Sequence, residues 1–525
     1  MAGSGLLLEN GRVYVTADPA DRTDAVLVER GLVTALGADA RRLARGDVRR
    51  IDLDGRVALP GFNDAHTHIM SVGLVELETD LSGAPDRSSA LDRLAANASD
   101  TPAGDWVIGF GYDESMWPTD ERRYLTMAEL DEVSTEHPVA AQRVDGHTMT
   151  LNARAFEQVD LAGVEDDVAI GPDGEPTGVI TEEAVGRLRR HLWPSGRKGR
   201  EALAAAVTKA TELGLTSVQT MSGLTVQSGS GSDRLRTFFD AWRADKLPIR
   251  LTAWVHPKHL ECMRDLELAG GFGDDRFRLG GLKRFADGSI GARTAKLDGE
   301  FADDPGNDGE LVMTPQRLSE SATTAASFGL PIATHAIGSA AIELVLDNYE
   351  EVHEEYERYD PLLRIEHVEL ASDAALERMA DMGVVASMQP NFLQWSSPGG
   401  LYESRLGEGR LGGDNRFRDV VAAGVPLAFG SDKMPFGPLY GIHHAVNAPF
   451  SSQEVSVETA VEAYTVGAAM AEGTADRKGT LEPGMLGDVV VLDRDPYDRP
   501  EEIIDTNIGM TIVDGKVVYE RDTRS

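Results

Sequence analysis

Amphipathic stretches and short apolar runs alternate along the chain from about residue 200 onwards. The amphipathic stretches are predicted to be helices, at 201–213, 234–244, 257–268, 315–328, 339–356, 373–382 and 415–423. Each precedes an apolar run predicted to be a strand, at 214–219, 249–255, 280–285, 331–335, 363–367, 384–389 and 425–432. With the apolar run 57–59 before His66, the chain has eight such units. Alternation of this kind implies parallel strands, and eight of them imply a closed (β/α)8 TIM-like barrel of the α/β class.

Both ends of the chain contain short strand-like runs separated by turns, and Asp514-Gly515-Lys516 is one such turn. We therefore predict a small β-sandwich domain built from both termini, residues 1–58 plus 475–525, beside a barrel domain at 59–474. The less regular region at about 70–200 is predicted to be an insert that covers the functional end of the barrel. Within it we expect helices at 91–98 and 127–133, a strand at 106–110 and a loop at 166–178.

The charge of the chain restricts its partners. Lys and Arg together number 51, Asp and Glu 87, and the net charge is −36. This excess disfavours binding to DNA, RNA or an anionic membrane. The acidic residues are spread along the whole chain, and no lysine occurs before Lys198. Because salt screens such self-repulsion, we hypothesise a halophilic, cytoplasmic protein, with an ordinary acidic soluble protein as the alternative.

The cysteine and apolar content also favour a cytoplasmic location. The chain has one cysteine, Cys262, so it cannot form an intrachain disulfide, which fits a reducing compartment. Its first ten residues lack the basic start and long apolar core of a signal peptide. It has no run of about 18 apolar residues that could span a membrane.

Two histidines, His66 and His68, follow the first apolar run and a Pro-Gly turn. In an extended strand, residues i and i+2 point to the same side, so the two imidazoles can face one point. Neutral imidazole is a good ligand for zinc and similar metals. The alternative is a pair of polar residues that merely face solvent at a strand end.

Further candidate ligands lie at the ends of other predicted strands. Active sites of such barrels sit at the carboxyl ends of the strands, where side chains from distant parts of the sequence converge. Any one of these histidines alone could be a structural residue, but the set together favours a divalent metal site. The predicted ligands are His66, His68, Lys283, His335, His367 and Asp432.

Motifs from nearly end to end resemble those of the metal-dependent amidohydrolase superfamily, and more narrowly its amidohydrolase family 3 branch, which includes N-substituted formamide deformylases. The most specific stretch is K-R-F-A-D-G-S-I-G-A-R-T-A at 283–295. The other matching stretches are P-G-F-N-D-A-H-T-H at 60–68, V-D-G-H at 144–147, T-G-V-I-T-E at 177–182, T-H-A-I-G at 334–338, I-E-H at 365–367, S-M-Q-P at 387–390, G-S-D at 430–432 and G-T-L-E-P-G-M-L-G-D at 479–488.

The resemblance implies a catalytic barrel beside a β-sandwich, with one or two zinc-like ions bound by the His66–His68 pair. Lys283 stands where relatives often carry a carbamylated lysine that bridges two metals. The alternative is an unmodified lysine that binds substrate or pairs with Asp432. Glu182 is a second candidate bridge, or else a residue that touches substrate or caps a helix. By analogy with similar barrels, a homodimer is also expected.

Other residues are predicted to bind a small-molecule substrate. His147 is expected to line the pocket or to stabilise its loop, and Gln389 belongs to the 387–390 motif. Lys433 departs from relatives, many of which have an aromatic or small residue there; it is either exposed or meets an anionic substrate group. The loop 391–413 contains Phe392, Trp395 and Tyr402, which favour an apolar or aromatic substituent or simply pack the loop.

The predicted reaction is hydrolysis of an amide or formamide C–N bond by metal-activated water. Asp432 is expected to accept the proton of the water and to deliver it to the leaving amine. His335 or His367, with the metal, would polarise the carbonyl. Hydrolysis of a cyclic amide or ester, deamination of a ring, and a non-catalytic regulator that binds a metal or small molecule are the alternatives.

Overall fold

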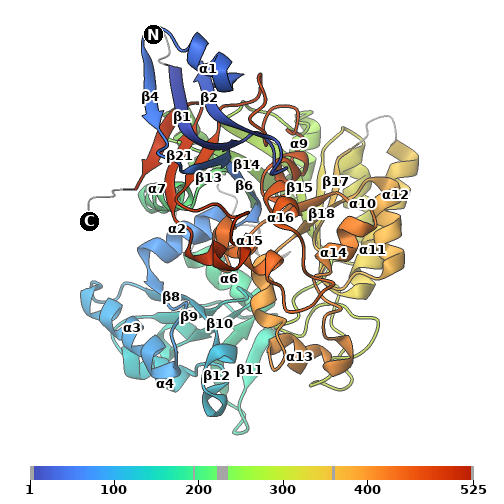
Figure 1. Ribbon diagram of the computed structural model, residues 1–525. Coiled ribbons are helices and arrows are strands. Elements are labelled where there is room, and N and C mark those ends of the chain that lie inside the picture. Colours follow the sequence, from blue (N-terminus) through green and yellow to red (C-terminus); the bar gives the residue numbers. More distant parts are fainter. Residues whose placement is uncertain (1–4, 193–195, 222–234, 357–360, 522–525) are drawn as a thin grey trace.

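An eight-stranded parallel barrel forms the centre of the molecule (Figure 1). This computed structural model describes residues 5–192, 196–221, 235–356 and 361–521. Neighbouring strands pair in chain order, and the backbone N–H of Asp432 closes the circle by donating to the His66 carbonyl at 2.8 Å. The TIM-like α/β fold is therefore confirmed. The barrel strands are β6 (Phe62–Thr67), β13 (Leu215–Met221), β14 (Arg250–Val255), β15 (Phe277–Phe285), β16 (Ile332–Ala336), β17 (Leu363–His367), β18 (Val385–Met388) and β19 (Leu427–Phe429).

Helices surround the barrel because their apolar stripes cover the outer faces of the strands. Local signals fix their ends: Thr314 caps α10 by accepting from the N–H of Arg317, and Pro315 occupies the first turn. The predicted helices are all present, as α7 (Gly196–Glu212), α8 (Leu235–Arg243), α9 (Leu260–Asp265), α10 (Pro315–Ala326), α11 (Ser339–Tyr356), α12 (Asp373–Met382) and α14 (Phe417–Ala422). The last barrel strand is followed by helices α15 (Pro438–Val446), α16 (Val457–Ala463) and α17 (Val466–Met470). Among the described helices, none has both the length and the apolar content needed to cross a bilayer.

Strands from both ends of the chain form a second sheet, in the order β22-β21-β20-β5-β1-β2-β3 with β4 also paired to β1. The antiparallel pair β5–β20 joins the two ends. The run 57–59 belongs to this sheet, not to the barrel, whose first strand begins only at Phe62. The strands are β1 (Gly5–Tyr14), β2 (Arg22–Glu29), β3 (Leu32–Leu36), β4 (Val48–Asp52), β5 (Val57–Pro60), β20 (Val489–Leu492), β21 (Ile508–Val513) and β22 (Lys516–Glu520), with helix α1 (Gly37–Leu43) after β3.

The segment between β6 and β13 contains a third, six-stranded sheet in the order β11-β12-β10-β9-β8-β7. Its strands are β7 (Thr79–Asp80), β8 (Val107–Tyr112), β9 (Val139–Arg143), β10 (Thr148–Leu151), β11 (Val168–Ile170) and β12 (Pro176–Thr181). Its helices are α3 (Arg87–Asp100), α4 (Met127–Val133), α5 (Ala153–Phe156) and α6 (Glu182–Leu192), and helix α2 (Ile69–Leu77) links it to β6. The loop predicted at 166–178 is wrong, because only the Gly-rich tip is a turn and the flanking residues pair as β11 and β12.

Candidate active site

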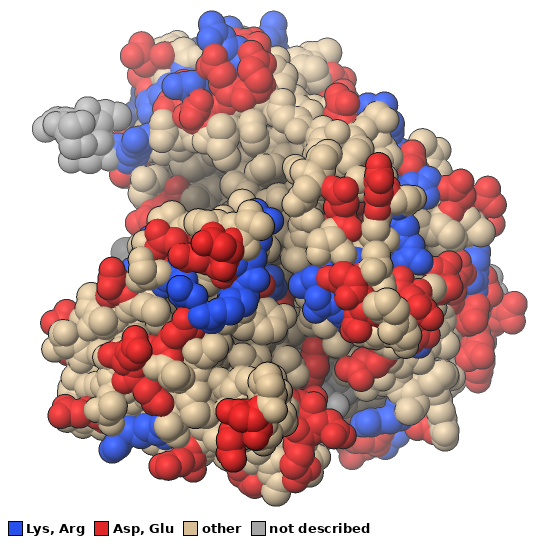
Figure 2. All heavy atoms as spheres, turned by 90° about the horizontal axis from the view of Figure 1, so that it is seen from below, with Lys and Arg blue, Asp and Glu red and all other residues tan. Residues whose placement is uncertain are grey.

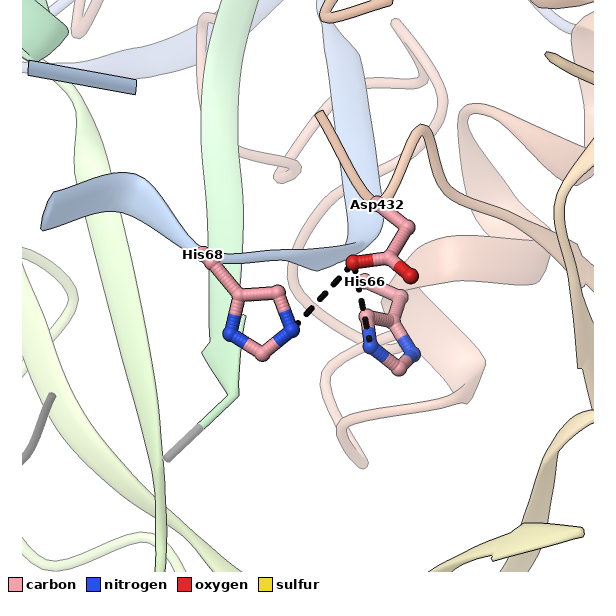
Figure 3. A group of neighbouring side chains, drawn as sticks. All are labelled: His66, His68 and Asp432. Atoms are coloured by element: carbon pink, nitrogen blue, oxygen red, sulfur yellow. Dashed lines mark ion pairs between the residues drawn. The ribbon is translucent and has the colours of Figure 1, made fainter. Parts of the chain in front are cut away.

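His66 and His68 lie at the carboxyl end of β6, where the strand gives way to α2, and both are buried. Their side chains point toward Asp432, which follows the last barrel strand (Figure 3). The Asp432 Oδ1 atom lies 3.2 Å from His68 Nε2 and 3.9 Å from His66 Nε2. One ligand atom from each of the three residues lies within 4.8 Å of the others, a spacing that suits a shared metal ion.

Hydrogen bonds on the far side of each imidazole fix its orientation. His66 Nδ1 lies 2.6 Å from Glu366 Oε2, and His68 Nδ1 lies 3.1 Å from the Met221 carbonyl. Each acceptor places the ring proton on Nδ1 and leaves Nε2 with a free lone pair toward Asp432. Burial lowers the pKa of both imidazoles, so the neutral, ligating form is favoured. Glu366 is itself held by Arg364, whose Nη2 lies 2.9 Å away.

Asp432 leaves β19 with a left-handed backbone, at φ 47°, which turns its carboxylate toward the histidines. Burial raises the pKa of Asp432, but the nearby His66, His68 and Lys433 side chains lower it by more, because any positive charge on them favours the carboxylate. Within the described residues, its buried Oδ1 receives no hydrogen bond. A buried carboxylate oxygen without a donor is costly, and a divalent cation would satisfy it. The donor set therefore fits a metal.

Lys283, on β15, points into the barrel interior and is fully buried. Its Nζ atom lies 4.7 Å from the centre of the Phe285 ring and has no hydrogen-bond partner among the described residues. Burial lowers its pKa to about 8. The alternative ion pair with Asp432 is therefore not formed in the described structure.

His367 and His335 continue the row of imidazoles. The ring centres of His66 and His367 are 4.9 Å apart, and those of His367 and His335 are 4.5 Å apart. His367 Nδ1 lies 2.7 Å from the side-chain oxygen of Gln389, and His335 Nε2 lies 2.9 Å from the Gly288 carbonyl. Burial lowers the pKa of both histidines, as it does for the first pair.

A pocket opens beside the histidines, between the barrel and the insert. Phe392 and Trp395 come from the 3₁₀ helix Pro390–Trp395, and Tyr402 comes from α13 (Leu401–Leu406). The insert supplies polar residues from the turn after β9, so it covers one side of the site. The lining residues are Arg143, Asp145, His147, Ser289, Ile290, Gly291, His335, Ile337, His367, Glu369, Phe392, Trp395, Leu401, Tyr402, Asp432 and Met434.

The other residues predicted to bind substrate differ in whether they line this pocket. His147 lines it, and its Nδ1 lies 3.1 Å from the Glu182 carboxylate. Glu182 opens α6 and also accepts from the Thr294 hydroxyl at 3.4 Å, so it contacts the pocket through His147. Gln389 supports His367. Lys433 is half-buried beside Asp432 and is not one of the residues that line the pocket.

Sequence reasoning missed three buried residues around the site. Glu366 lies inside the I-E-H motif at 365–367, and its position directly before the predicted ligand His367 was an available signal. Arg143 directly precedes the quoted V-D-G-H motif; its Nε and Nη1 each donate at 2.9 Å, to Glu114 and Asp145. Glu369 lines the pocket two residues after His367, and no pattern in the sequence marks it.

Similarity to known proteins covers nearly the whole chain. The model of the amidohydrolase family matches residues 49–519. The protein YtcJ of Bacillus subtilis is 29% identical over 97% of this chain and 98% of its own length. The N-substituted formamide deformylase of Arthrobacter pascens is 26% identical over 98% of both chains. The crystal structure of an uncharacterized metal-dependent hydrolase from Pyrococcus furiosus is 28% identical, with a TM-score of 0.75 over 94% of this chain and 100% of that one.

Proposed function

Because the chain belongs to the amidohydrolase family, we propose that it hydrolyses a C–N bond of a small amide or formamide with the help of a divalent metal. The observation that carries the proposal is the convergence of His66, His68 and Asp432, each of which has a ligand atom within 4.8 Å of those of the other two, with the Asp432 Oδ1 atom buried. The similarity to N-substituted formamide deformylase supports the type of bond.

His66, His68 and Asp432 would hold the metal, and their nitrogen and oxygen donors suit zinc. Once bound, such an ion activates water at neutral pH. His367 and His335 follow His66 at ring-centre distances of 4.9 and 4.5 Å, and Lys283 is close enough for its charge to act on all three histidines, so these residues would supply ligands for a second ion. We propose that Lys283 serves in this way as a carbamate, because its buried amine has no hydrogen-bond partner in the described structure.

The chain's own groups divide the remaining work. Asp432 would accept a proton from the attacking water and return it to the leaving amine. One ring nitrogen of His367 lies against the Gln389 side-chain oxygen, and one of His335 lies against the Gly288 carbonyl. A neutral imidazole has a single N–H, so neither ring has another N–H that could bind the substrate carbonyl. This favours ligand roles for both over polarisation of the substrate carbonyl.

Metal analysis and a substrate panel test the proposal. Protein purified in high salt without chelator should contain one or two equivalents of zinc and should hydrolyse at least one N-substituted formamide. Asp432→Ala should lower kcat by about 10²–10⁴-fold, whereas the exposed Asp381→Ala should behave as wild type. Cyclic amides and aryl esters belong on the same panel, and turnover of those alone would reassign the bond. Protein that binds no zinc after incubation would overturn the proposal.

A further inference from the structure

A second cavity, of about 710 Å³, lies between the sheet of the insert and the helices α2 and α7. Its volume is in the range of small-molecule binding sites. No described residue lines both this cavity and the pocket beside the metal site. The buried residues among those described on its wall form what we call its floor, and they are Ser71, Ile108, Phe110, Gln142 and Met149.

Gln142, on β9, is a polar side chain without a partner in the middle of this floor. In the strand pairing it lies opposite Phe110 on β8 and opposite Met149 on β10, so the three side chains share one face of the sheet. Gln142 is 2% exposed, and in the described ranges of the chain no hydrogen bond reaches its carboxamide. A buried carboxamide gains free energy from hydrogen bonds, and a ligand in the cavity would supply them.

The chemistry of the floor favours an uncharged ligand with an amide group. The Gln142 carboxamide presents an N–H donor and a carbonyl acceptor side by side. A second carboxamide matches both at once, whereas a ketone or a carboxylate offers acceptors alone. Ser71, on α2, adds a hydroxyl group, and the other three floor residues are apolar. None of the five described floor residues carries a charge, so the floor does not compensate a buried ion.

The charged residues described on the wall lie at the rim of the cavity, and they carry both signs. Glu78 is half-buried, and Asp100, Asp105, Arg197, Lys198 and Glu201 are exposed. Arg197 and Glu201 pair with each other at 2.7 Å. Exposed charges are hydrated and screened by salt, so they discriminate weakly between ligands. The choice of ligand therefore depends on the floor.

We propose that this cavity binds a small uncharged amide with an apolar body. The body would pack on Ile108, Phe110 and Met149, and the amide would form paired hydrogen bonds with Gln142. Because no residue proposed for catalysis is among those described on its wall, the cavity would hold the ligand without converting it. The inference goes beyond the proposed hydrolysis and does not depend on it.

Calorimetric titration of the zinc-loaded protein with benzamide and with acetophenone tests the recognition. The two probes have nearly the same shape, and only benzamide has N–H donors. Wild type should bind benzamide at least about tenfold more tightly than acetophenone, and Gln142→Leu should bring this ratio close to one. The exposed Gln158→Leu, which makes the same change elsewhere, should keep the wild-type ratio. A ratio near one in wild type, or a ratio kept in Gln142→Leu, would overturn the inference.

A second variant protects the test against misfolding. Gln142→Leu replaces a buried polar group that has no partner with an apolar one, so it should fold. If circular dichroism shows that it does not, Gln142→Met takes its place, because methionine keeps the unbranched shape of glutamine. An unchanged ratio in that folded variant counts against the inference.

The variant Asp432→Ala separates this cavity from the pocket beside the metal site. It should keep the wild-type affinity for benzamide, because Asp432 lines only the other pocket. Affinity lost in Asp432→Ala and kept in Gln142→Leu would place benzamide beside the metal and overturn the inference. Binding that depends on Gln142, in a protein that hydrolyses no amide, would support the inference and remove the proposed function.

Discussion

At the residue scale, the contact between His66 and Glu366 determines how the first ligand is presented. The Glu366 carboxylate lies 2.6 Å from His66 Nδ1 and so fixes the tautomer of the ring. Arg364 in turn donates to this carboxylate. Neither role requires contact with a metal or a substrate. Glu366 is therefore a positioning residue, and its effect should be seen in metal affinity.

We expect Glu366→Gln to weaken zinc binding by about 10–100-fold, because a neutral amide holds the imidazole less firmly than a carboxylate does. Competition with a fluorescent chelator measures the affinity directly. Glu377→Gln, an exposed change on α12, is the matched control. Equal zinc affinity in Glu366→Gln and wild type would contradict the positioning role.

Asp287 makes a different kind of contribution, to two loops of the site. Its carboxylate accepts from the backbone N–H groups of Lys296, Ile337 and Gly338, at 2.9, 3.1 and 2.8 Å. Asp287→Ala would leave these donors without a partner, and we expect a loss of about 3 kcal/mol or more in unfolding free energy. Urea denaturation measures the loss, which should be smaller in Asp287→Asn. An Ala variant as stable as wild type would show that water replaces the carboxylate.

How far sequence could predict the site depends on the kind of residue. His66, His68 and Asp432 stand at strand ends, and strand ends of a closed barrel converge, so periodicity and residue type were sufficient to place them together. Glu369 and Arg143 depend on tertiary partners instead. Glu369 becomes part of the pocket only because Tyr402 and Asn415 fold against it, and no spacing in the chain encodes that contact.

At the element scale, a buried ion pair joins the terminal sheet to the barrel. Arg250, on β14, donates to both oxygens of Asp488, at 2.6 and 2.8 Å, just before β20. Burial raises the pKa of Asp488, but the Arg250 guanidinium outweighs burial and holds the pKa below its usual range. The contact therefore favours the ionised carboxylate and ties stability to pH.

We expect Asp488→Asn to lower the unfolding free energy at pH 7 by about 1.5–3 kcal/mol, because Arg250 loses one charged hydrogen-bond partner and keeps the other, Asp514. The lowered pKa stabilises the fold fully above the ordinary aspartate value of about 4 and progressively less as pH falls through the folded value. Wild type should therefore lose stability on acidification more steeply than the variant. Thermal melting between about pH 7 and 3 tests this, and parallel curves would contradict it.

The elements that sequence misassigned share one physical cause, a turn that lies inside an apolar or polar run. In sequence, the apolar run 57–59 continues without a break into the barrel strand β6. In the structure, the chain turns at Pro60-Gly61 and passes from the terminal sheet into the barrel. A Cβ atom on Gly61 would lie 2.3 Å from the Thr216 hydroxyl oxygen, so only glycine fits there. At 166–178, the Gly and Asp residues of the tip obscured two short strands. The other seven barrel strands were predictable because a helix precedes each of them.

At the scale of the whole molecule, the net charge of −36 is the dominant feature. Figure 2 shows carboxylates over much of the face seen from below, with smaller groups of Lys and Arg between them. Such a surface repels itself most where screening is weakest.

We expect the melting temperature to rise steeply as KCl increases from about 0.05 to 1 M, because the Debye length falls from above 10 Å to about 3 Å. Differential scanning fluorimetry measures the rise. Substituting exposed Asp and Glu residues with Asn and Gln, away from the pocket, should flatten the dependence. Equal stability in dilute buffer and in molar salt would contradict the halophilic hypothesis.

The hydrogen bond that closes the barrel, from the Asp432 N–H to the His66 carbonyl, joins the backbones of two proposed ligands. The seam between the first and last strands and the metal site are thus one structure. An ion held by both side chains would cross-link the first and last strands, and separation of these strands would move its ligands apart. The rate of zinc release would then report how often the barrel opens.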